Sequence, residues 1–139
     1  YSPLSDEMKH GVLDVVKNEL LTPKGLRTLA PKNPAYEGTY EGDQATRDRA
    51  YHQGTVWPWL LGPYIEANFR LYGKKFAKTA RELLANFEED MTVYGVCSIG
   101  EIYDGNPPYT PNGCISQAWS VGEILRSMAL LEKLCKDDR

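Results

Sequence analysis

The chain has 139 residues, a formal net charge of −3 and 25% charged residues, which is typical of one ordinary soluble domain. Its mild acidity and its lack of a Lys/Arg stripe exclude the electrostatic footprint of a nucleic-acid-binding protein. The longest apolar-leaning run, residues 56–67, contains two prolines and a glutamate, so it is too short and too polar to span a bilayer. We therefore expect residues 1–139 to form a single domain that binds neither nucleic acid nor membrane.

The three cysteines, Cys97, Cys114 and Cys135, are odd in number and form no CxxC pair. Neither a disulfide framework nor a zinc site is expected from them, and free thiols in a reducing compartment, the cytoplasm, are the default. The first residues lack the charged-then-apolar pattern of a signal peptide. Because the chain begins without Met and opens almost directly into a helix, we expect it to be part of a longer protein.

Helical periodicity appears first over residues 5–21, where Ser5 is a plausible N-cap. Residues 74–93 show the clearest amphipathic pattern, with one apolar stripe and a charged opposite side. Residues 114–134 are apolar over most of their circumference until Arg126, which predicts that the first half of this helix is buried among other helices. The apolar stripe of the first helix contains Met8, Val12, Val15, Val16 and Leu20.

A further helix is expected between these, with Thr55 as its N-cap and Pro58 in its first turn. Gly62 and Pro63 should kink it, and Gly73 is a suitable residue to end it.

Two long segments lack any sustained period, residues 22–53 and 94–113, and both are rich in Pro and Gly. Their apolar and aromatic residues predict ordered loops, and we expect a short helical turn over residues 43–50 within the first. No strand pattern of useful length is present. The sequence thus predicts an all-α domain of about four main helices with two long ordered loops, arranged as stacked helical hairpins or as a slice of an α/α toroid.

Glu101 is the first candidate for chemistry, because it lies in an irregular segment beside Asp104 and the rings of Tyr103 and Tyr109. A carboxylate beside aromatic rings is the arrangement that a glycoside hydrolase needs: the rings stack on sugar faces and the carboxylate handles a proton or a water. The alternatives are that Asp104 only closes a turn with the Gly-Asn that follows, and that Glu101 is an ordinary exposed loop residue.

The stretch YHQGTVWPW, residues 51–59, concentrates rings and hydrogen-bonding groups. On a helix, Trp57 and Trp59 would point to different sides, so Trp59 is expected in the core while Trp57 is free to line a cavity. Three residues beside Trp57 could share that cavity: Tyr51, His52 and Gln53. A structural, hydrogen-bonded histidine remains the alternative for His52.

Gln117 and Trp119 lie in the first two turns of the last helix, and either could face a pocket at the rim. Glu123 and Arg126, three residues apart, are best explained as a surface ion pair. No His/Cys/Asp cluster has metal-ligand spacing and no phosphate-binding loop is present, so neither a metal nor a cofactor is expected.

Three stretches together resemble the C-terminal end of the glycogen debranching enzyme family, its amylo-α-1,6-glucosidase domain. They are LLTPKGLRTLAP (20–31), AYHQGTVWPWLLGPYIEA (50–67) and IGEIYDGNPPYTPNGCISQAWSVGEILR (99–126). Their order and spacing make the resemblance specific, because other α/α-toroid glycosidases share only the aromatic-rich rim.

The resemblance implies an (α/α)6 barrel that hydrolyses the α-1,6-linked glucose left at branch points of glycogen-like glucans, with inversion. Glu101, in the family's GEI-DG motif, would be the general base. Tyr51, His52, Gln53 and Trp57 would bind the sugar. Tyr103, Gln117 and Trp119 would contribute at the same rim.

The resemblance also implies an incomplete catalytic pair. The family's general acid is an Asp in a Thr-Trp-Met-Asp type motif, which these residues do not contain. We therefore expect the chain to supply about the last third of a barrel, to be inactive alone, and to self-associate through uncovered helix faces. Its partners would be a branched α-glucan and the remainder of the parent chain. Two alternatives stay open: a non-catalytic glucan-binding module, and a helical interaction module in which the aromatic residues are core.

Overall fold

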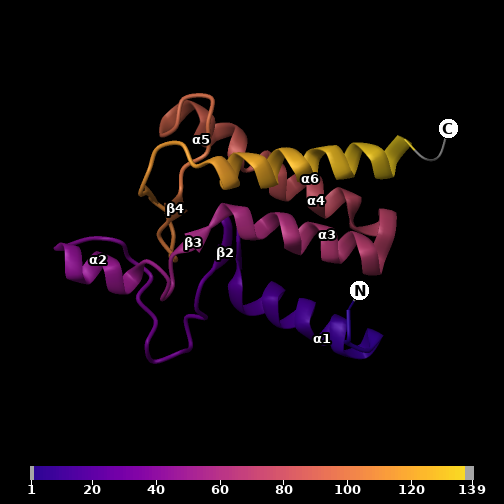
Figure 1. Cartoon of the computed structure of the whole chain (residues 1–139), viewed down its shortest axis with the longest axis horizontal. Coiled ribbons are helices and arrows are strands. Elements are labelled where there is room, and N and C mark those ends of the chain that lie inside the picture. The colour runs from indigo at the N-terminus through magenta and orange to yellow at the C-terminus, as the bar shows by residue number, and fades with distance from the viewer. Residues whose placement is uncertain (1, 137–139) are drawn as a thin grey trace.

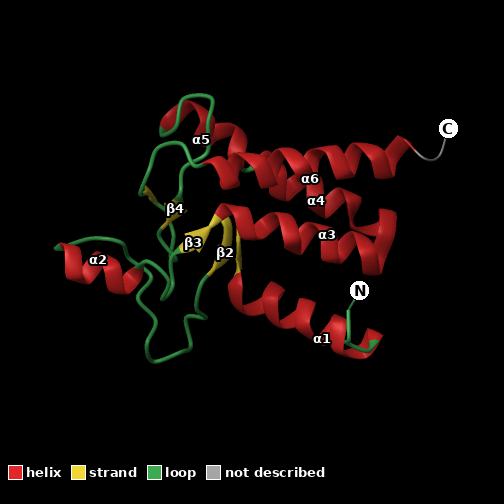
Figure 2. Ribbon diagram, viewed as in Figure 1, coloured by secondary structure: helices red, strands yellow, loops and turns green. Residues whose placement is uncertain are grey.

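Helices lie side by side across one half of the molecule, and a small sheet with long loops occupies the other half (Figure 1, Figure 2). The computed structural model describes residues 2–136. In this range α1 (Asp6–Val15) contacts α3 (Leu61–Tyr72), and α6 (Ala118–Lys136) packs on α3 and on α4 (Ala77–Ala85). The core between them contains Leu61, Ile65, Ala80, Leu84, Phe87 and Ile124.

The N-terminal helix begins as predicted, because the Ser5 hydroxyl accepts a hydrogen bond from the Met8 N–H at 3.2 Å. A π-helical turn, Val16–Leu20, continues α1 to the first strand. The helical spacing is right, but Met8, Val12 and Val15 are largely exposed. Leu13 lies on the side of α1 that packs against α3 and is buried there. The helix therefore has apolar side chains on two sides, and the rest of the structure covers only the side with Leu13.

The expectation of an all-α chain is wrong in one respect, because the described residues also form a five-stranded antiparallel sheet. The domain is mostly helical, and the closed toroid stays a prediction. The sheet follows chain order, β1-β2-β3-β4-β5. Its strands have two or three residues each: β1 Leu21–Thr22, β2 Gly25–Arg27, β3 Val56–Trp57, β4 Ile102–Tyr103 and β5 Pro111–Asn112.

The prediction that Thr55 caps a helix is wrong. Thr55 is fully buried, and its hydroxyl donates to the carbonyl oxygens of Ala50 and Tyr51, so it closes the end of the short helix α2 (Gln44–Ala50). The chain then enters β3 and a 3-10 turn, Pro58–Leu60, before α3 begins. The predicted kink at Gly62 and Pro63 does not interrupt α3. Both residues lie in its first turn, where proline is tolerated.

The predicted helix over 74–93 is divided into three parts: a 3-10 turn, Gly73–Phe76, then α4, then α5 (Phe87–Val93). The break between α4 and α5 falls at Asn86. The Asn86 carbonyl oxygen accepts a hydrogen bond from the Lys24 ammonium at 2.8 Å, and Lys24 also pairs with Asp90 at 2.8 Å. The lysine therefore satisfies a backbone acceptor that the helix leaves open at its end.

The expectation that the first half of α6 is buried all round is wrong. Its buried side chains, Ser120, Ile124, Ser127 and Leu131, lie on one face, while Trp119 and Leu125 are 48% and 60% exposed. The helix is an outer element that packs on α3 and α4 from one side only.

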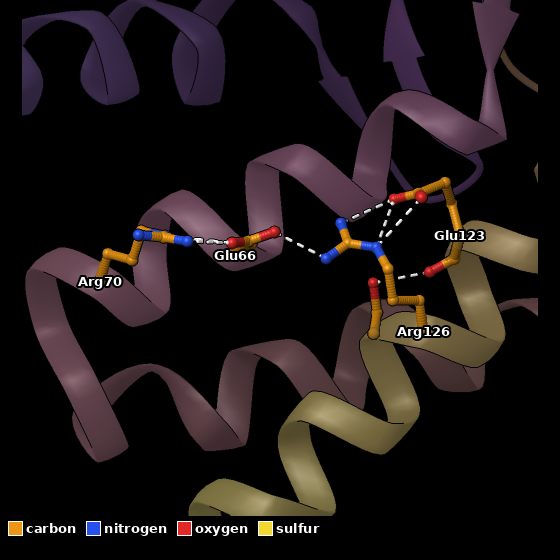
Figure 3. A network of polar contacts seen from close by, with 5 residues as sticks. Glu66, Arg70, Glu123 and Arg126 are labelled. Carbon is orange, nitrogen blue, oxygen red and sulfur yellow. Dashed lines mark hydrogen bonds and ion pairs between the residues drawn. The ribbon is translucent and has the colours of Figure 1, made fainter. Parts of the chain in front are cut away.

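Arg126 joins α6 to α3 (Figure 3). Its guanidinium pairs with Glu66 of α3 at 2.6 Å and with Glu123 of its own helix at 2.7 Å, and Glu66 also pairs with Arg70. The predicted Glu123–Arg126 pair is thus confirmed, and it extends into a network between two helices. The hydrogen bonds from Arg70 and Arg126 keep the pKa of Glu66 below its usual value, so this carboxylate stays charged.

The first long loop packs against the second where three glycines surround the ring of Tyr36. A Cβ added at Gly38, Gly54 or Gly105 would lie within 3 Å of the Tyr36 side chain. The Gly105 N–H donates to the Gly38 carbonyl oxygen at 2.6 Å, and Arg27 donates to the Gly105 carbonyl oxygen at 2.7 Å. These contacts fix residues 36–54 beside the β4–β5 hairpin.

Across residues 2–136, the helices are too short or too polar to traverse a membrane.

Candidate active site

Most of the predicted site residues lie just after α2, around β4 and at the start of α6, and hydrogen bonds from Tyr51 and Gln117 to Glu101 bring these three segments together. Glu101 lies directly before β4, and its N–H donates to the Cys114 carbonyl oxygen at 3.0 Å. This backbone bond continues the β4–β5 hairpin by one more pair. This pairing places Cys114 opposite the Glu101 side chain.

The half-buried Glu101 carboxylate accepts four hydrogen bonds from three residues. On Oε1 the donors are the Tyr51 hydroxyl, in a short contact, and the Gln117 amide at 3.4 Å. On Oε2 they are the Cys114 N–H at 3.0 Å and the Cys114 thiol at 3.3 Å. A carboxylate has about four lone-pair positions, so this set occupies all of them.

These donors also set the protonation states. Burial raises the pKa of Glu101, but the hydrogen bonds from Tyr51, Cys114 and Gln117 outweigh it and leave that pKa below its usual value. Burial and the hydrogen bond to Glu101 raise the pKa of the Tyr51 hydroxyl far above its usual range. The hydrogen bond to Glu101 likewise raises the pKa of the Cys114 thiol. At neutral pH the site therefore holds one charged carboxylate surrounded by protonated donors.

A continuous row of rings borders this carboxylate. Tyr51 lies edge-on to Trp57 with ring centroids 4.9 Å apart, and His52 stacks on Trp57 at 5.0 Å. Trp119 meets the edge of Trp57 at 5.7 Å and stacks on Trp59 at 5.5 Å. The expectation that Trp57 lines a cavity while Trp59 lies in the core is wrong, because Trp57, on β3, is only 2% exposed and Trp59 is half-buried. The Trp57 indole N–H donates to the Tyr51 carbonyl oxygen at 3.0 Å. The exposed members of the row, His52 and Trp119, are the surfaces that a ligand can reach.

The model of the family described as amylo-alpha-1,6-glucosidase matches residues 1–126. The chain belongs to the amylo-alpha-1,6-glucosidase family. The match includes all three stretches on which the sequence resemblance rests, and it confirms that resemblance. The chain is thereby related to the glycosidase domain of glycogen debranching enzymes.

The amylo-α-1,6-glucosidase fold brings most of the predicted site residues together. Tyr51 and Gln117 donate hydrogen bonds directly to Glu101. His52 and Trp57 pack on the Tyr51 ring, and Trp119 packs on Trp57. Gln53 is exposed beside them, with its carbonyl oxygen accepting from the Glu37 N–H at 2.7 Å.

Tyr103 is placed differently from the other predicted residues. It is fully buried on β4, where burial and the nearby Asp90 raise its pKa, so it presents no surface to a sugar. Asp104 also has a structural position: its Oδ1 accepts hydrogen bonds from the Tyr40 N–H at 2.9 Å and the Asn112 amide at 3.0 Å. The hairpin uses Asp104 to hold the first long loop, rather than only to close its own turn.

Cys114 is the site residue that the sequence analysis missed. It lies thirteen positions after Glu101, and only the pairing of β4 with β5 brings it to the carboxylate. The three cysteines are free thiols, as expected. In the part of the chain that the structure describes, no cluster of three or more His, Cys, Asp or Glu side chains is placed to hold a metal ion.

Proposed function

We propose that this chain forms part of a glucosidase site that hydrolyses α-1,6-linked glucose at the branch points of glycogen-like glucans, with Glu101 as the general base. The observation that carries the proposal is the Glu101 carboxylate of the GEI-DG stretch, held ionised by four donors at the border of an aromatic row. A general base must be unprotonated at the working pH, and this hydrogen-bond set favours that state.

In the inverting reaction that we propose, Glu101 takes a proton from a water as the water oxygen bonds to the anomeric carbon. The bond from that carbon to the glycosidic oxygen breaks on the opposite face, and a general acid protonates the leaving oxygen. The two carboxyl groups of such a pair are roughly 6.5–9.5 Å apart, which leaves room for the water. We infer that the acid comes from the remainder of the parent chain, and that the 139 residues alone are inactive.

All four lone-pair positions of the Glu101 carboxylate are occupied, so one donor must leave before the attacking water can hydrogen-bond to it. The Gln117 amide makes the longest of the nitrogen contacts, 3.4 Å to Oε1, and Gln117 is half-exposed at the start of α6. We infer that the water displaces this amide from Oε1, while Tyr51 keeps its own bond to the same oxygen. The freed amide is then available to a sugar hydroxyl or to the water itself.

The aromatic row supports binding of the glucose ring. Sugars present apolar C–H faces that pack on aromatic rings, and His52 and Trp119 are the accessible rings of the row. Trp57 lies beneath both and fixes their positions. We infer that the exposed Gln53, which follows His52 in the chain, binds sugar hydroxyls.

The test is Glu101→Gln in the full-length parent protein, which keeps the size of the side chain and removes its ability to accept a proton as a base. Turnover of a branched limit dextrin should fall about 10²- to 10⁴-fold while glucan binding survives. Glu88→Gln, the same change at an exposed position of α5, is the matched control and should leave turnover unchanged. A Glu101→Gln enzyme with most of its turnover would show that the base is another residue.

A non-catalytic glucan-binding module is the second candidate, and the half-exposed Trp119 stacked on Trp59 favours it over a purely structural role for the rings. Both candidates predict a change in Trp fluorescence when isomaltose or a maltooligosaccharide is added. Only the glucosidase predicts the loss of turnover in Glu101→Gln.

A further inference from the structure

The turn formed by Gly113 and Cys114 closes directly onto the Glu101 carboxylate. Gly113 has a φ of +74°, and a Cβ added there would lie 2.4 Å from Oε2 of Glu101. The Gly113 carbonyl oxygen accepts a hydrogen bond from the Tyr94 hydroxyl at 2.9 Å, which holds the turn in place. The next residue, Cys114, turns both its N–H and its thiol to the same carboxylate oxygen.

We propose that Cys114 is a positioning residue for Glu101: its two donors hold Oε2 and fix the carboxylate so that the Oε1 edge receives the attacking water. This inference rests on the proposed role of Glu101 as the base. A side chain held at one oxygen by two donors from a single residue cannot rotate without losing both bonds. Without the thiol, Oε2 would keep one donor, the Cys114 N–H, and its position would be fixed less tightly.

The thiol and the carboxylate affect each other reciprocally. The thiol donates to the charged form of Glu101 and favours it, while the charged carboxylate disfavours loss of the thiol proton. The other titratable side chains around the pair are Tyr40, Tyr51 and Tyr94, with His52 against the Tyr51 ring. Cys114 is exposed to solvent, yet this partner suppresses the thiolate form through which cysteines react.

Alkylation rates test the coupling without any measurement of activity. The full-length protein and its Glu101→Gln variant are treated with iodoacetamide at one pH, and modification of each cysteine is followed by peptide mass spectrometry. Loss of the carboxylate charge should speed alkylation of Cys114 about three-fold or more, which corresponds to a fall of half a unit or more in the thiol pKa. Cys97, also exposed, is the control in the same molecule and should not change. Equal Cys114 rates in the two proteins would overturn the proposal.

The kinetic test compares Cys114→Ala with Cys114→Ser in the full-length enzyme. Alanine removes a donor to the charged carboxylate, so the pKa of Glu101 rises and the acidic limb of the kcat/KM profile moves up by about half a pH unit. We expect kcat to fall several-fold with KM little changed, and serine, which restores a donor, to recover the profile. A purely structural role would lower Tm without moving the acidic limb, and that result would reject positioning.

The two proposals fail in different ways. If Glu101→Gln keeps its turnover, the base assignment fails, but faster alkylation of Cys114 in that variant would still establish the coupling. If Glu101→Gln is inactive and the Cys114 rate and the acidic limb stay fixed, the base stands and the positioning role falls.

Discussion

Substitution of Gly113 by alanine should disable the site while leaving the fold in place. The new Cβ would lie 2.4 Å from Oε2 and 3.1 Å from the Cβ of Glu101. Ordinary contacts at these atoms are about 3.4 Å or longer, so the carboxylate must move by about 1 Å. A displacement of that size at a reacting group can cost about 10²-fold in rate. The positive φ of Gly113 adds about 1–2 kcal/mol of backbone strain once a side chain is present.

The assay measures kcat on a branched limit dextrin together with Tm, for the full-length Gly113→Ala enzyme. Gly73→Ala is the matched control, because Gly73 also has a positive φ, +55°, but a Cβ there would meet nothing within 4 Å. Both variants should lose stability, and only Gly113→Ala should lose about 10²-fold in kcat. Normal turnover in Gly113→Ala, or an equal loss in Gly73→Ala, would refute the argument that the turn sets the carboxylate position.

Three further predictions concern charged groups. Lys24→Met should lower the free energy of unfolding, measured in urea, by about 3–5 kcal/mol, because it leaves the Asp90 carboxylate buried without its partner. The double variant with Asp90→Leu should recover most of this loss. Arg126→Met should cost only about 1 kcal/mol, since its side chain is 39% exposed, and the cost should shrink in high salt. The folded pKa of Glu101 is lowered, so its stabilising contribution is present above the ordinary Glu pKa and is lost as pH falls through the folded value. The Tm difference between wild type and Glu101→Gln should therefore narrow in acid, and a constant difference from pH 7 to pH 3 would contradict the lowered pKa.

Helical periodicity was sufficient to locate the longer helices α1, α3 and α6, because each is long enough to show a repeating apolar face, whereas it did not show the break between α4 and α5. The cap at Ser5 and the ion pair of Glu123 with Arg126 were also evident from local spacing. Which helix faces remain exposed was not evident from the sequence. Periodicity shows that a helix has an apolar face, but it does not show which neighbour covers that face. That is why the sequence did not show that one apolar side of α1 is left exposed.

The sheet escaped prediction for a different reason. A strand of two residues cannot display an alternating pattern, and both residues of β3 and of β4 are buried, so no alternation exists to detect. This explains the assignment of Tyr103 to the site, although it belongs to the covered interior. It also explains why Cys114 was missed, because its contact with Glu101 depends on strand pairing rather than on any local motif.

The order of pairing in this sheet bears on how the protein folds. Strand β3 joins Leu26 on one side to Tyr103 on the other through Trp57 and Val56, so its partners come from opposite halves of the chain. Each pairing closes a long loop at an entropic cost that no local contact offsets. The helices can form from nearby residues, whereas the carboxylate and its donors come together only when the distant halves have met. An internal deletion that removes β2 and spares every helix would thus disrupt the arrangement around Glu101, and amide exchange at Val56 would report when that arrangement forms.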